Sequence, residues 1–330
     1  MALKLKLSDY IATFLFEKNV KTVFAVSGGA SLHLIHAIDD HPSLNYVCTH
    51  HEQGAAMAAD GYSRVTGNIG VAISTSGPGA TNLITGICCS FYDSVPLLII
   101  TGQVSTFRMT GDTGVRQIGF QETPITSMTK NITKYSKTLQ NPNDIRFELE
   151  KAFYLAKEGR PGPVILDIPD NFQREYVEIS NLREFCLKKS SSFPRIFPDS
   201  KNCFKQIITL LKKSQRPILI AGWGVHLSKT EAELLKLIEY FHIPIALTWG
   251  GSDLVASNHE LYIGTFGTHG LRHANFAVQN ADLIISIGSR LDTKSTGSPI
   301  TTFAREAKKI MIDIDPNELG KFKKFNLDFD

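Results

Sequence analysis

The sequence predicts an α/β protein of two domains, each with a mainly parallel sheet flanked by helices. Three observations support this fold class. Apolar runs of strand length alternate with longer amphipathic stretches. One polar stretch interrupts the alternation, and 330 residues are more than one ordinary core needs. Such alternation favours a parallel sheet with helices on both faces.

The first half contains short apolar runs, expected to be buried strands, with helical stretches between them. We expect the strands at Val23–Val26, Tyr46–Thr49, Gly70–Ser74, Leu97–Thr101 and Val164–Ile168. The helices are expected at Leu7–Lys18, Gln53–Thr66, Ala80–Tyr92 and Ile145–Lys157.

The polar stretch Gln173–Asn202 is expected to be an interdomain linker. It separates a first domain over residues 1–172 from a second over residues 203–330. In the second domain we expect strands at Pro217–Ala221, Pro244–Thr248, Leu283–Gly288 and Ile310–Ile314, with helices at Thr230–Phe241 and Arg272–Asn280. The chain stops after Asn326–Asp330 as if it were entering another strand, so this domain is expected to be truncated at its C-terminal end.

Composition argues against several classes of function. The net charge of +3 comes from scattered Lys and Arg, which gives no electrostatic footprint for nucleic acid. No segment approaches the ~20 apolar residues that cross a bilayer, and no secretion signal is evident. The five cysteines lack C-x-x-C spacing, so neither a metal site nor a disulfide framework is expected. Cys48, Cys88 and Cys89 are expected to be buried, and a cytoplasmic location is expected.

Glu52 directly follows an expected strand and begins a helix rich in small residues. A carboxylate in the first turn of a helix is favoured by the helix dipole, so capping by itself explains this residue. His50 and His51 precede it, but adjacent residues of a strand point to opposite faces and are not expected to bind one metal ion. Taken alone, Glu52 indicates a helix start.

A glycine-containing turn follows the strand Gly70–Ser74 and leads into the next helix. It reads Ser74-Thr75-Ser76-Gly77-Pro78-Gly79-Ala80-Thr81-Asn82. Glycines let a backbone approach a ligand closely, and a helix N-terminus favours an anion. The Gly-Lys-Ser/Thr ending of a P-loop is absent, and as an isolated turn the segment is more often structural than functional.

These two features belong to an ordered series of motifs. The others in the first half are Ser27-Gly28-Gly29-Ala30-Ser31, Asp93-Ser94-Val95-Pro96, Thr101-Gly102-Gln103-Val104, Gly119-Phe120-Gln121-Glu122-Thr123-Pro124 and Gly159-Arg160-Pro161-Gly162-Pro163-Val164. From about Leu7 to Pro169, the series closely resembles the pyrimidine-binding domain of acetolactate synthases and related thiamine-diphosphate (ThDP) enzymes. Segments of the second half, including Gly264–Gly270, Gly288–Asp292 and Asp313–Pro316, look like the central domain of that family.

The resemblance implies a catalytic role for Glu52. In the family, a buried glutamate bonds the pyrimidine nitrogen N1′ of ThDP and favours the imino tautomer, whose nitrogen removes the thiazolium C2 proton. The remaining assignments are implied in the same way. Gly28, Gly29, Ala30, Pro78, Gly79 and Asn82 are expected to bind ThDP, and Phe120 and Gln121 are expected to border the substrate. For that last pair, a packed Phe and a surface Gln are the alternative.

The central domain of acetolactate synthases holds FAD, and a corresponding site here would comprise Gly222, Gly224, His269, Gly270, Arg290 and Asp313. The match is partial, because Trp223 and Val225 stand in the glycine-rich turn and Asp292-Thr293-Lys294 replaces Asp-Asp-Arg. Two interpretations therefore stay open: an FAD site, and a domain that only stabilises the fold.

No Gly-Asp-Gly followed by Asn occurs, although a third domain with that motif binds Mg²⁺ and the ThDP diphosphate in the family. The chain is therefore expected to be the N-terminal portion of a longer enzyme or half of a split one, and to be inactive alone. A homo-oligomer, dimer or tetramer, is implied because family active sites form between subunits.

The expected activity is that of an acetolactate synthase-like 2-oxo acid decarboxylase and carboligase, which moves a hydroxyethyl unit from pyruvate to a second 2-oxo acid. Alternatives are another ThDP decarboxylase or lyase of sugar or polysaccharide metabolism, and a non-catalytic dimerising partner. A nucleotide-binding module has the weakest support.

Overall fold

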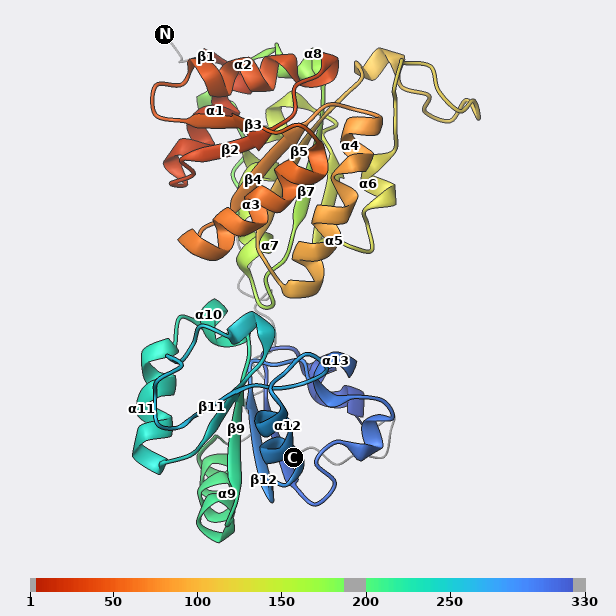
Figure 1. Cartoon of the computed structure of the whole chain (residues 1–330). Coiled ribbons are helices and arrows are strands. Elements are labelled where there is room, and N and C mark those ends of the chain that lie inside the picture. Colours follow the sequence, from red (N-terminus) through yellow and green to blue (C-terminus); the bar gives the residue numbers. More distant parts are fainter. Residues whose placement is uncertain (1–3, 187–199, 323–330) are drawn as a thin grey trace. The chain divides into compact units, whose positions relative to one another are not determined.

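A computed structural model describes residues 4–186 and 200–322 of the chain. The chain divides into two compact units, Met1–Ser191 and Ser192–Asp330 (Figure 1). Each unit is an α/β fold with a parallel sheet between helices, which confirms the predicted fold class. The expectation that Asn326–Asp330 enter a strand falls outside the described residues.

The first unit contains a six-stranded sheet in the order β3-β2-β4-β5-β7-β6. All its neighbouring strands are parallel. The strands are β2 (Thr22–Ala25), β3 (Asn45–Cys48), β4 (Gly70–Ser74), β5 (Leu97–Gln103), β6 (Tyr135–Thr138) and β7 (Val164–Pro169). The order reverses between β2 and β4, because β3 lies on one side of β2 and all later strands lie on the other.

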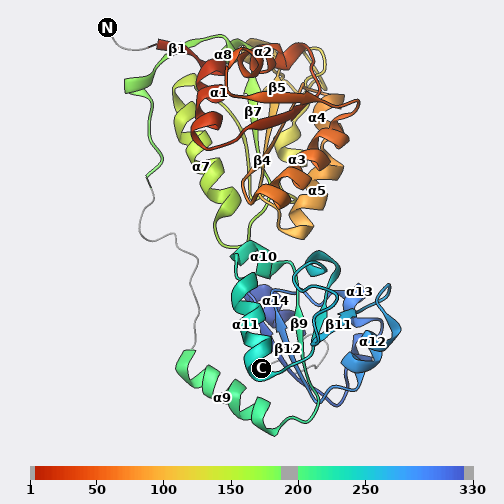
Figure 2. The same cartoon turned by 60° about the vertical axis from the view of Figure 1, so that its left-hand side comes forward.

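Helices cover both faces of this sheet (Figure 2). The helices are α1 (Leu7–Glu17), α2 (Leu32–Asp40), α3 (Glu52–Thr66), α4 (Pro78–Asn82), α5 (Ile84–Asp93), α6 (Ile125–Met128), α7 (Ile145–Lys157) and α8 (Asp170–Gln173). Strand residues alternate between two apolar clusters, as a period of two requires. Val71 and Ile73 pack with α1, α2 and α7, whereas Ala72 between them packs with α3 and α5.

A small antiparallel sheet joins β1 (Lys4–Lys6) to β8 (Tyr176–Glu178), at the other end of the first unit's sequence. Val177 and Leu182 are buried in the core of this unit. The first part of the expected linker 173–202 therefore packs as part of the first unit. Phe185 also packs against the rings of Phe147 and Tyr154. The polar composition of the segment concealed these few apolar contacts.

The second unit contains a five-stranded parallel sheet in the order β11-β10-β9-β12-β13. Its strands are β9 (Pro217–Ala221), β10 (Ile245–Leu247), β11 (Tyr262–Thr265), β12 (Leu283–Ile287) and β13 (Lys308–Ile312). The helices are α9 (Ser200–Lys213), α10 (Gly224–Ser228), α11 (Glu231–Phe241), α12 (Arg272–Gln279), α13 (Thr293–Thr296) and α14 (Pro316–Gly320). The sheet lies between α12 on one face and α9 with α11 on the other.

Every expected strand is present within a few residues. Elements that were not predicted include β6, β11, α2 and α9, and α9 begins within the expected linker. Details of the expected elements also differ. The expected helix Ala80–Tyr92 is divided into α4 and α5, because Leu83 N bonds Ala80 O in a tighter turn. The strand β3 is exposed rather than buried, since it lies at the edge of the sheet. Cys48 on β3 is consequently exposed. On α5, Cys89 is also exposed and Cys88 is half-buried, so none of the three is buried as expected.

Candidate cofactor and substrate site

The candidate residues of the first unit lie where parallel strands of its sheet end. The turn at Gly28 follows β2, Glu52 follows β3, and the turn at Gly77 follows β4. Parallel strands bring their carboxyl ends to one edge, and ligands of open α/β sheets bind at that edge where the strand order reverses. The reversal here lies between β2 and β4. The fold therefore gathers the predicted ThDP residues at its most favourable ligand position.

Glu52 is the first residue of α3 and is only 9% exposed. The ring nitrogen Nδ1 of His51 accepts a hydrogen bond from Gln53 N at 3.1 Å and caps the helix, so the imidazole fills the capping role. The Glu52 carboxylate points elsewhere, and its Oε2 accepts a hydrogen bond from Asn82 Nδ2 at 2.9 Å. Two predicted site residues, thirty positions apart in the chain, thus meet directly.

The turn after β4 places the backbone close to the Glu52 carboxylate. Gly77 has a φ of +62°, and Pro78 begins α4 immediately after it. A Cβ placed on Gly79 would lie 2.8 Å from Thr75 Cγ2 and 3.2 Å from Glu52 Oε1. Even one added carbon at residue 79 would therefore collide with Thr75, and the absence of a side chain lets the α4 backbone lie close to the Glu52 carboxylate.

The turn Gly28–Ala30 is held against the same segment by Thr75. Ala30 N donates a hydrogen bond to Thr75 Oγ1 at 3.1 Å, and a Cβ on Gly28 would lie 2.5 Å from Thr75 Cβ. By contrast, no atom lies within 4 Å of the corresponding Cβ position on Gly29. Thr75 was not predicted as a site residue. Its position directly after β4 and two residues before Gly77 could have indicated it.

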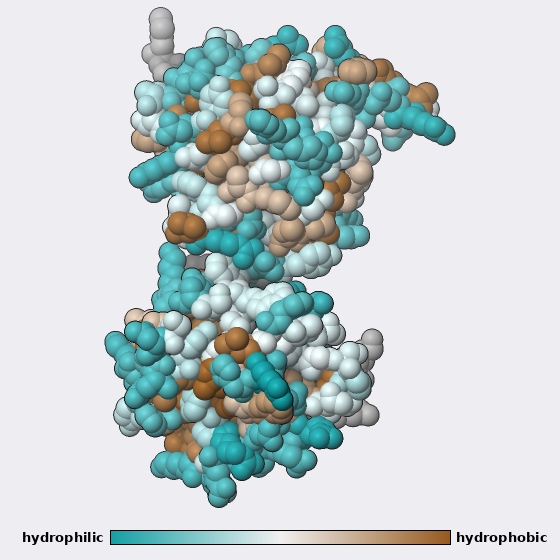
Figure 3. Space-filling model, viewed as in Figure 1, coloured by the Kyte–Doolittle hydropathy of each residue, from teal (hydrophilic) through white to brown (hydrophobic). Residues whose placement is uncertain are grey.

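The expected substrate pair lies on the long loop between β5 and α6, the yellow loop that projects from the first unit in Figure 1. A Cβ on Gly77 would lie 2.7 Å from Gln121 Cβ, so Gln121 rests directly on the predicted ThDP turn. Phe120 is 84% exposed. Figure 3 shows apolar surface on the projecting part of this loop, among hydrophilic side chains.

A buried carboxylate supports the strands beneath this loop. Asp167 of β7 is 1% exposed and accepts hydrogen bonds from Thr101 at 2.7 Å, Gln103 at 3.0 Å and Thr138 at 3.1 Å. Burial raises the pKa of Asp167 to about 6, and these hydrogen bonds oppose the rise. Gln103 Nε2 also donates to Thr123 O at 2.9 Å, which ties the end of the loop to β5.

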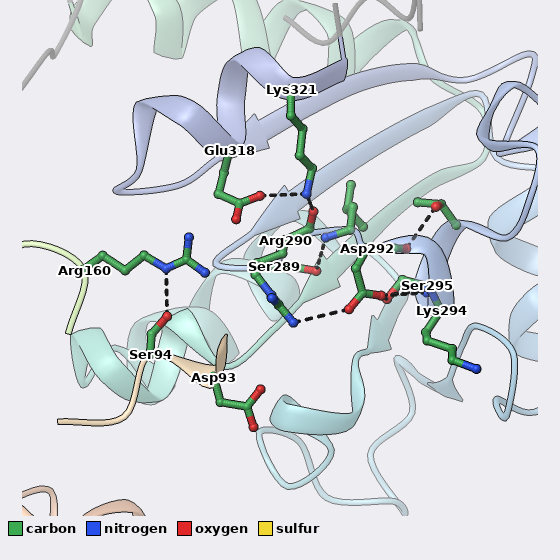
Figure 4. A network of polar contacts seen from close by, with 12 residues as sticks. Asp93, Ser94, Arg160, Ser289, Arg290, Asp292, Lys294, Ser295, Glu318 and Lys321 are labelled. Atoms are coloured by element: carbon green, nitrogen blue, oxygen red, sulfur yellow. Dashed lines mark hydrogen bonds and ion pairs between the residues drawn. The ribbon is translucent and has the colours of Figure 1, made fainter. Parts of the chain in front are cut away.

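Two further motifs of the series meet in the first unit. Arg160 Nε donates a hydrogen bond to Ser94 Oγ at 2.8 Å, which joins the turn after α5 to the turn before β7 (Figure 4). Ser94 has a φ of +62° at the C-terminus of α5. These motifs thus fix the packing of the unit and lie outside the Glu52 cluster.

The predicted residues of the second unit have mainly structural contacts. Arg290 Nη2 lies 3.4 Å from Asp292 Oδ2 (Figure 4). The rings of His269 and Trp249 lie 4.9 Å apart, and Asp313 Oδ1 accepts a hydrogen bond from Asp315 N at 2.9 Å. A Cβ on Gly270 would lie 2.4 Å from the backbone of Phe266. That glycine is thus needed for packing within its own turn.

The two glycines after β9 pack against the turn after β12. Gly222 N donates to Ile287 O at 3.0 Å, Gly224 N to Gly288 O at 2.9 Å, and Val225 N to Gly222 O at 3.1 Å. A dinucleotide site uses the N–H groups of such a turn to bind the pyrophosphate. Here these groups are bonded to carbonyl oxygens of the chain. In this arrangement these three N–H groups are not available to a pyrophosphate.

Within the described ranges 4–186 and 200–322, no helix is long and apolar enough to cross a membrane. The same residues include no cluster of three or more His, Cys, Asp or Glu side chains placed to hold a metal ion.

Two family models match this chain. Residues 5–127 match the model of the thiamine pyrophosphate enzyme N-terminal TPP binding domain, and residues 204–329 match the thiamine pyrophosphate enzyme central domain. TPP and ThDP are the same cofactor.

Similar proteins include the chloroplastic acetolactate synthase of Arabidopsis thaliana, 39% identical over 96% of this chain and 46% of the relative. The acetolactate synthase large subunit of Corynebacterium glutamicum is 40% identical over 95% and 49%. The probable large subunit of Methanocaldococcus jannaschii is 38% identical over 96% and 52%. The chain thus spans about half the length of these relatives. With both domain models matched in chain order, this chain belongs to the thiamine pyrophosphate enzymes and carries their N-terminal TPP binding domain and central domain.

Proposed function

We propose that this chain forms the pyrimidine-binding and central part of an acetolactate synthase-like enzyme, which decarboxylates a 2-oxo acid and joins the remaining unit to a second 2-oxo acid. One observation carries the proposal: the almost buried Glu52 carboxylate is oriented by Asn82 and lies beside the glycine turn at Gly79, where the parallel strands end. The acetolactate synthase names of the relatives support the choice of reaction.

The residues would act as follows. Bound ThDP supplies the thiazolium carbon that takes up the substrate unit. Glu52 would hold a proton at the pyrimidine nitrogen through Oε1, because Asn82 already bonds Oε2. Gly28, Gly29, Ala30 and Pro78 would provide backbone walls around the cofactor. Phe120 and Gln121 would give the substrate an apolar wall and an amide donor.

The 330 residues supply no diphosphate or metal motif, so we propose that Mg²⁺ and the ThDP diphosphate are held by a further domain of the complete enzyme. A homo-oligomer, dimer or tetramer, follows from the same proposal, since that domain would come from a neighbouring subunit. We place the enzyme in the cytoplasm, where the five cysteines, none of them in a disulfide, would stay reduced.

For the central unit we propose a structural role in preference to an FAD site. The hydrogen bonds of the turn at Gly222–Val225 support this choice, because they engage the N–H groups that a pyrophosphate would need. The purified enzyme should therefore show no visible flavin absorption after reconstitution with FAD and desalting. Stoichiometric flavin retained under these conditions would overturn the structural role and leave the role of Glu52 intact.

The catalytic proposal is tested with Glu52→Gln in the complete enzyme that contains this chain. Glutamine keeps the size of the side chain and an acceptor for Asn82, but it cannot exchange a proton. Exchange of the ThDP C2 proton and ThDP-dependent consumption of pyruvate should both fall by at least about 100-fold. Glu148→Gln is the matched control, because Glu148 is equally buried but lies on α7, in the core. Equal rates for wild type and Glu52→Gln would refute the assigned role.

A further inference from the structure

The loop between β5 and α6 carries the substrate pair with little regular structure of its own. Residues 111–118 are all exposed, and η2 (Thr106–Arg108) is its one short helical turn. Phe107, Val115, Ile118 and Phe120 expose more than half of their surface. Burial of apolar side chains therefore does not hold the loop in place, and its position depends on polar contacts.

Glu122 makes the contacts that join the two arms of the loop. Its Oε1 accepts hydrogen bonds from Thr110 N at 2.7 Å and Thr110 Oγ1 at 2.9 Å, on the outgoing arm. Its Oε2 accepts a hydrogen bond from Ile118 N at 3.2 Å, on the returning arm. The Glu122 carbonyl oxygen accepts a further bond from Gln117 Nε2 at 3.1 Å. One carboxylate therefore closes the exposed tip, residues 111–117.

Glu122 directly follows the residue that contacts the predicted ThDP turn. Gln121 has a φ of +64°, a conformation that non-glycine residues keep only where neighbouring contacts enforce it. Its backbone and Cβ lie against Gly77, which itself has a positive φ. A change in the path of the loop at Glu122 would thus move Gln121 away from Gly77.

The ionised form of Glu122 is favoured by its surroundings. Partial burial alone would raise the pKa of its carboxyl group, but hydrogen bonds from Thr110, Ile118 and Gly119 outweigh burial and lower that pKa. A carboxylate that accepts bonds from several N–H groups makes stronger bonds than a neutral amide would. Replacement by glutamine also turns one acceptor into a donor, which cannot bind Ile118 N.

We propose that Glu122 is a positioning residue for substrate binding: its carboxylate closes the β5–α6 loop so that Gln121 and Phe120 stand beside the ThDP turn. This role rests on the proposed function, because it assumes that these two residues face a 2-oxo acid. Glu122 itself would touch neither cofactor nor substrate.

The first experiment measures amide hydrogen exchange in the full chain. In Glu122→Gln, amides of residues 110–122 should exchange about tenfold faster, since two or more local bonds are weakened. Asp112→Asn is the matched control, because it removes a charge at the exposed tip of the same loop. Thr110→Val, which removes only the hydroxyl donor, should give a smaller change in the same direction. Unchanged exchange in Glu122→Gln would overturn the proposal.

The second experiment uses the complete enzyme. Glu122→Gln should raise KM for the 2-oxo acid about tenfold, with the C2 proton exchange of bound ThDP at the wild-type rate. If wild type shows no C2 exchange, the proposed function itself fails. If C2 exchange is normal and KM does not change in Glu122→Gln, the function stands and the positioning role is wrong.

Discussion

At the start of α3, His51 makes the capping hydrogen bond and Glu52 makes a separate contact with Asn82. His51 caps the helix through Nδ1, and the Glu52 carboxylate contacts Asn82 beside the turn at Gly79. The N-cap hydrogen bond is therefore made by His51, while Glu52 lies in the first turn, where the helix dipole favours an acidic side chain. A carboxylate that is nearly buried and not engaged by its own helix is available to a ligand.

The Gly79 position offers a direct test of this arrangement. Gly79→Ala would bring a methyl group to 2.8 Å from Thr75 Cγ2 and 3.2 Å from Glu52 Oε1. We expect a loss of about 1–3 kcal/mol in the free energy of unfolding and a loss of ThDP binding. Gly29→Ala is the control for stability, because its new methyl group meets no atom within 4 Å, and it should change stability by less than about 0.5 kcal/mol. Urea unfolding and ThDP titration measure both quantities, and equal stability of the two variants would contradict the prediction.

The elements are held together by a few close contacts and one buried network. Helices α3 and α5 approach closely because small residues face each other, with Gly86 against Ala56. Strands β5, β6 and β7 share the carboxylate of Asp167, whose three side-chain donors come from β5 and β6. These contacts fix the platform from which the site loops extend.

Gly86→Ala should destabilise the packing of α5 on α3. A Cβ at Gly86 would lie 2.4 Å from Ala56 Cβ, so the helices must separate, at about 1–3 kcal/mol in the free energy of unfolding. Gly61→Ala is a matched change within α3 itself, where the added methyl group meets no atom within 4 Å. This second variant should be more stable than wild type by about 0.5–1 kcal/mol, since alanine favours a helix. Chemical denaturation measures the free energy of unfolding of both variants. It should fall in Gly86→Ala and rise in Gly61→Ala.

Asp167 should make stability depend on pH. Its pKa is raised from 3.8 to about 6, so the folded state binds a proton more tightly than the unfolded state. This contribution favours folding fully below about pH 4 and is lost as the pH rises through 6. Two pKa units correspond to about 3 kcal/mol. Asp167→Asn should abolish this part of the decline in unfolding free energy between pH 4 and 6, measured by urea titration. If the unfolding free energy of the variant declined with pH as steeply as that of wild type, another group would be responsible.

Each compact unit of the molecule has its own apolar clusters. The clusters of the first unit lie between Leu7 and Leu182, and those of the second between Ile207 and Phe322. The Glu52 cluster, with Thr75 and Gln121, lies entirely in the first unit. A unit that buries its own apolar surface can fold without its neighbour.

Residues 1–191, expressed alone, are therefore expected to fold. The fragment should show helical circular dichroism and a single cooperative urea transition, because its clusters contain no residue from the second unit. Glu52→Gln in this fragment should leave the transition intact. A fragment that melts without cooperativity would show that the first unit depends on the second.

The amino-acid sequence by itself determined the fold class, nearly all the strands of both sheets and the residue types of the candidate site. These depend on hydrophobic period, turn signals and short motifs, which are local in the chain. The exposure of β3 was not predictable, because an edge strand and a buried strand can share one local pattern.

Only the tertiary structure decided which residues meet. Asn82 reaches Glu52 across thirty positions, and Gln121 rests on Gly77, because the parallel strands end at one edge. It also showed that the turn at Gly222–Val225 packs against Gly288, that Thr75 bonds Ala30 and that Glu122 bonds both arms of its loop. Such contacts join distant segments, and their geometry exists only when the sheet has formed.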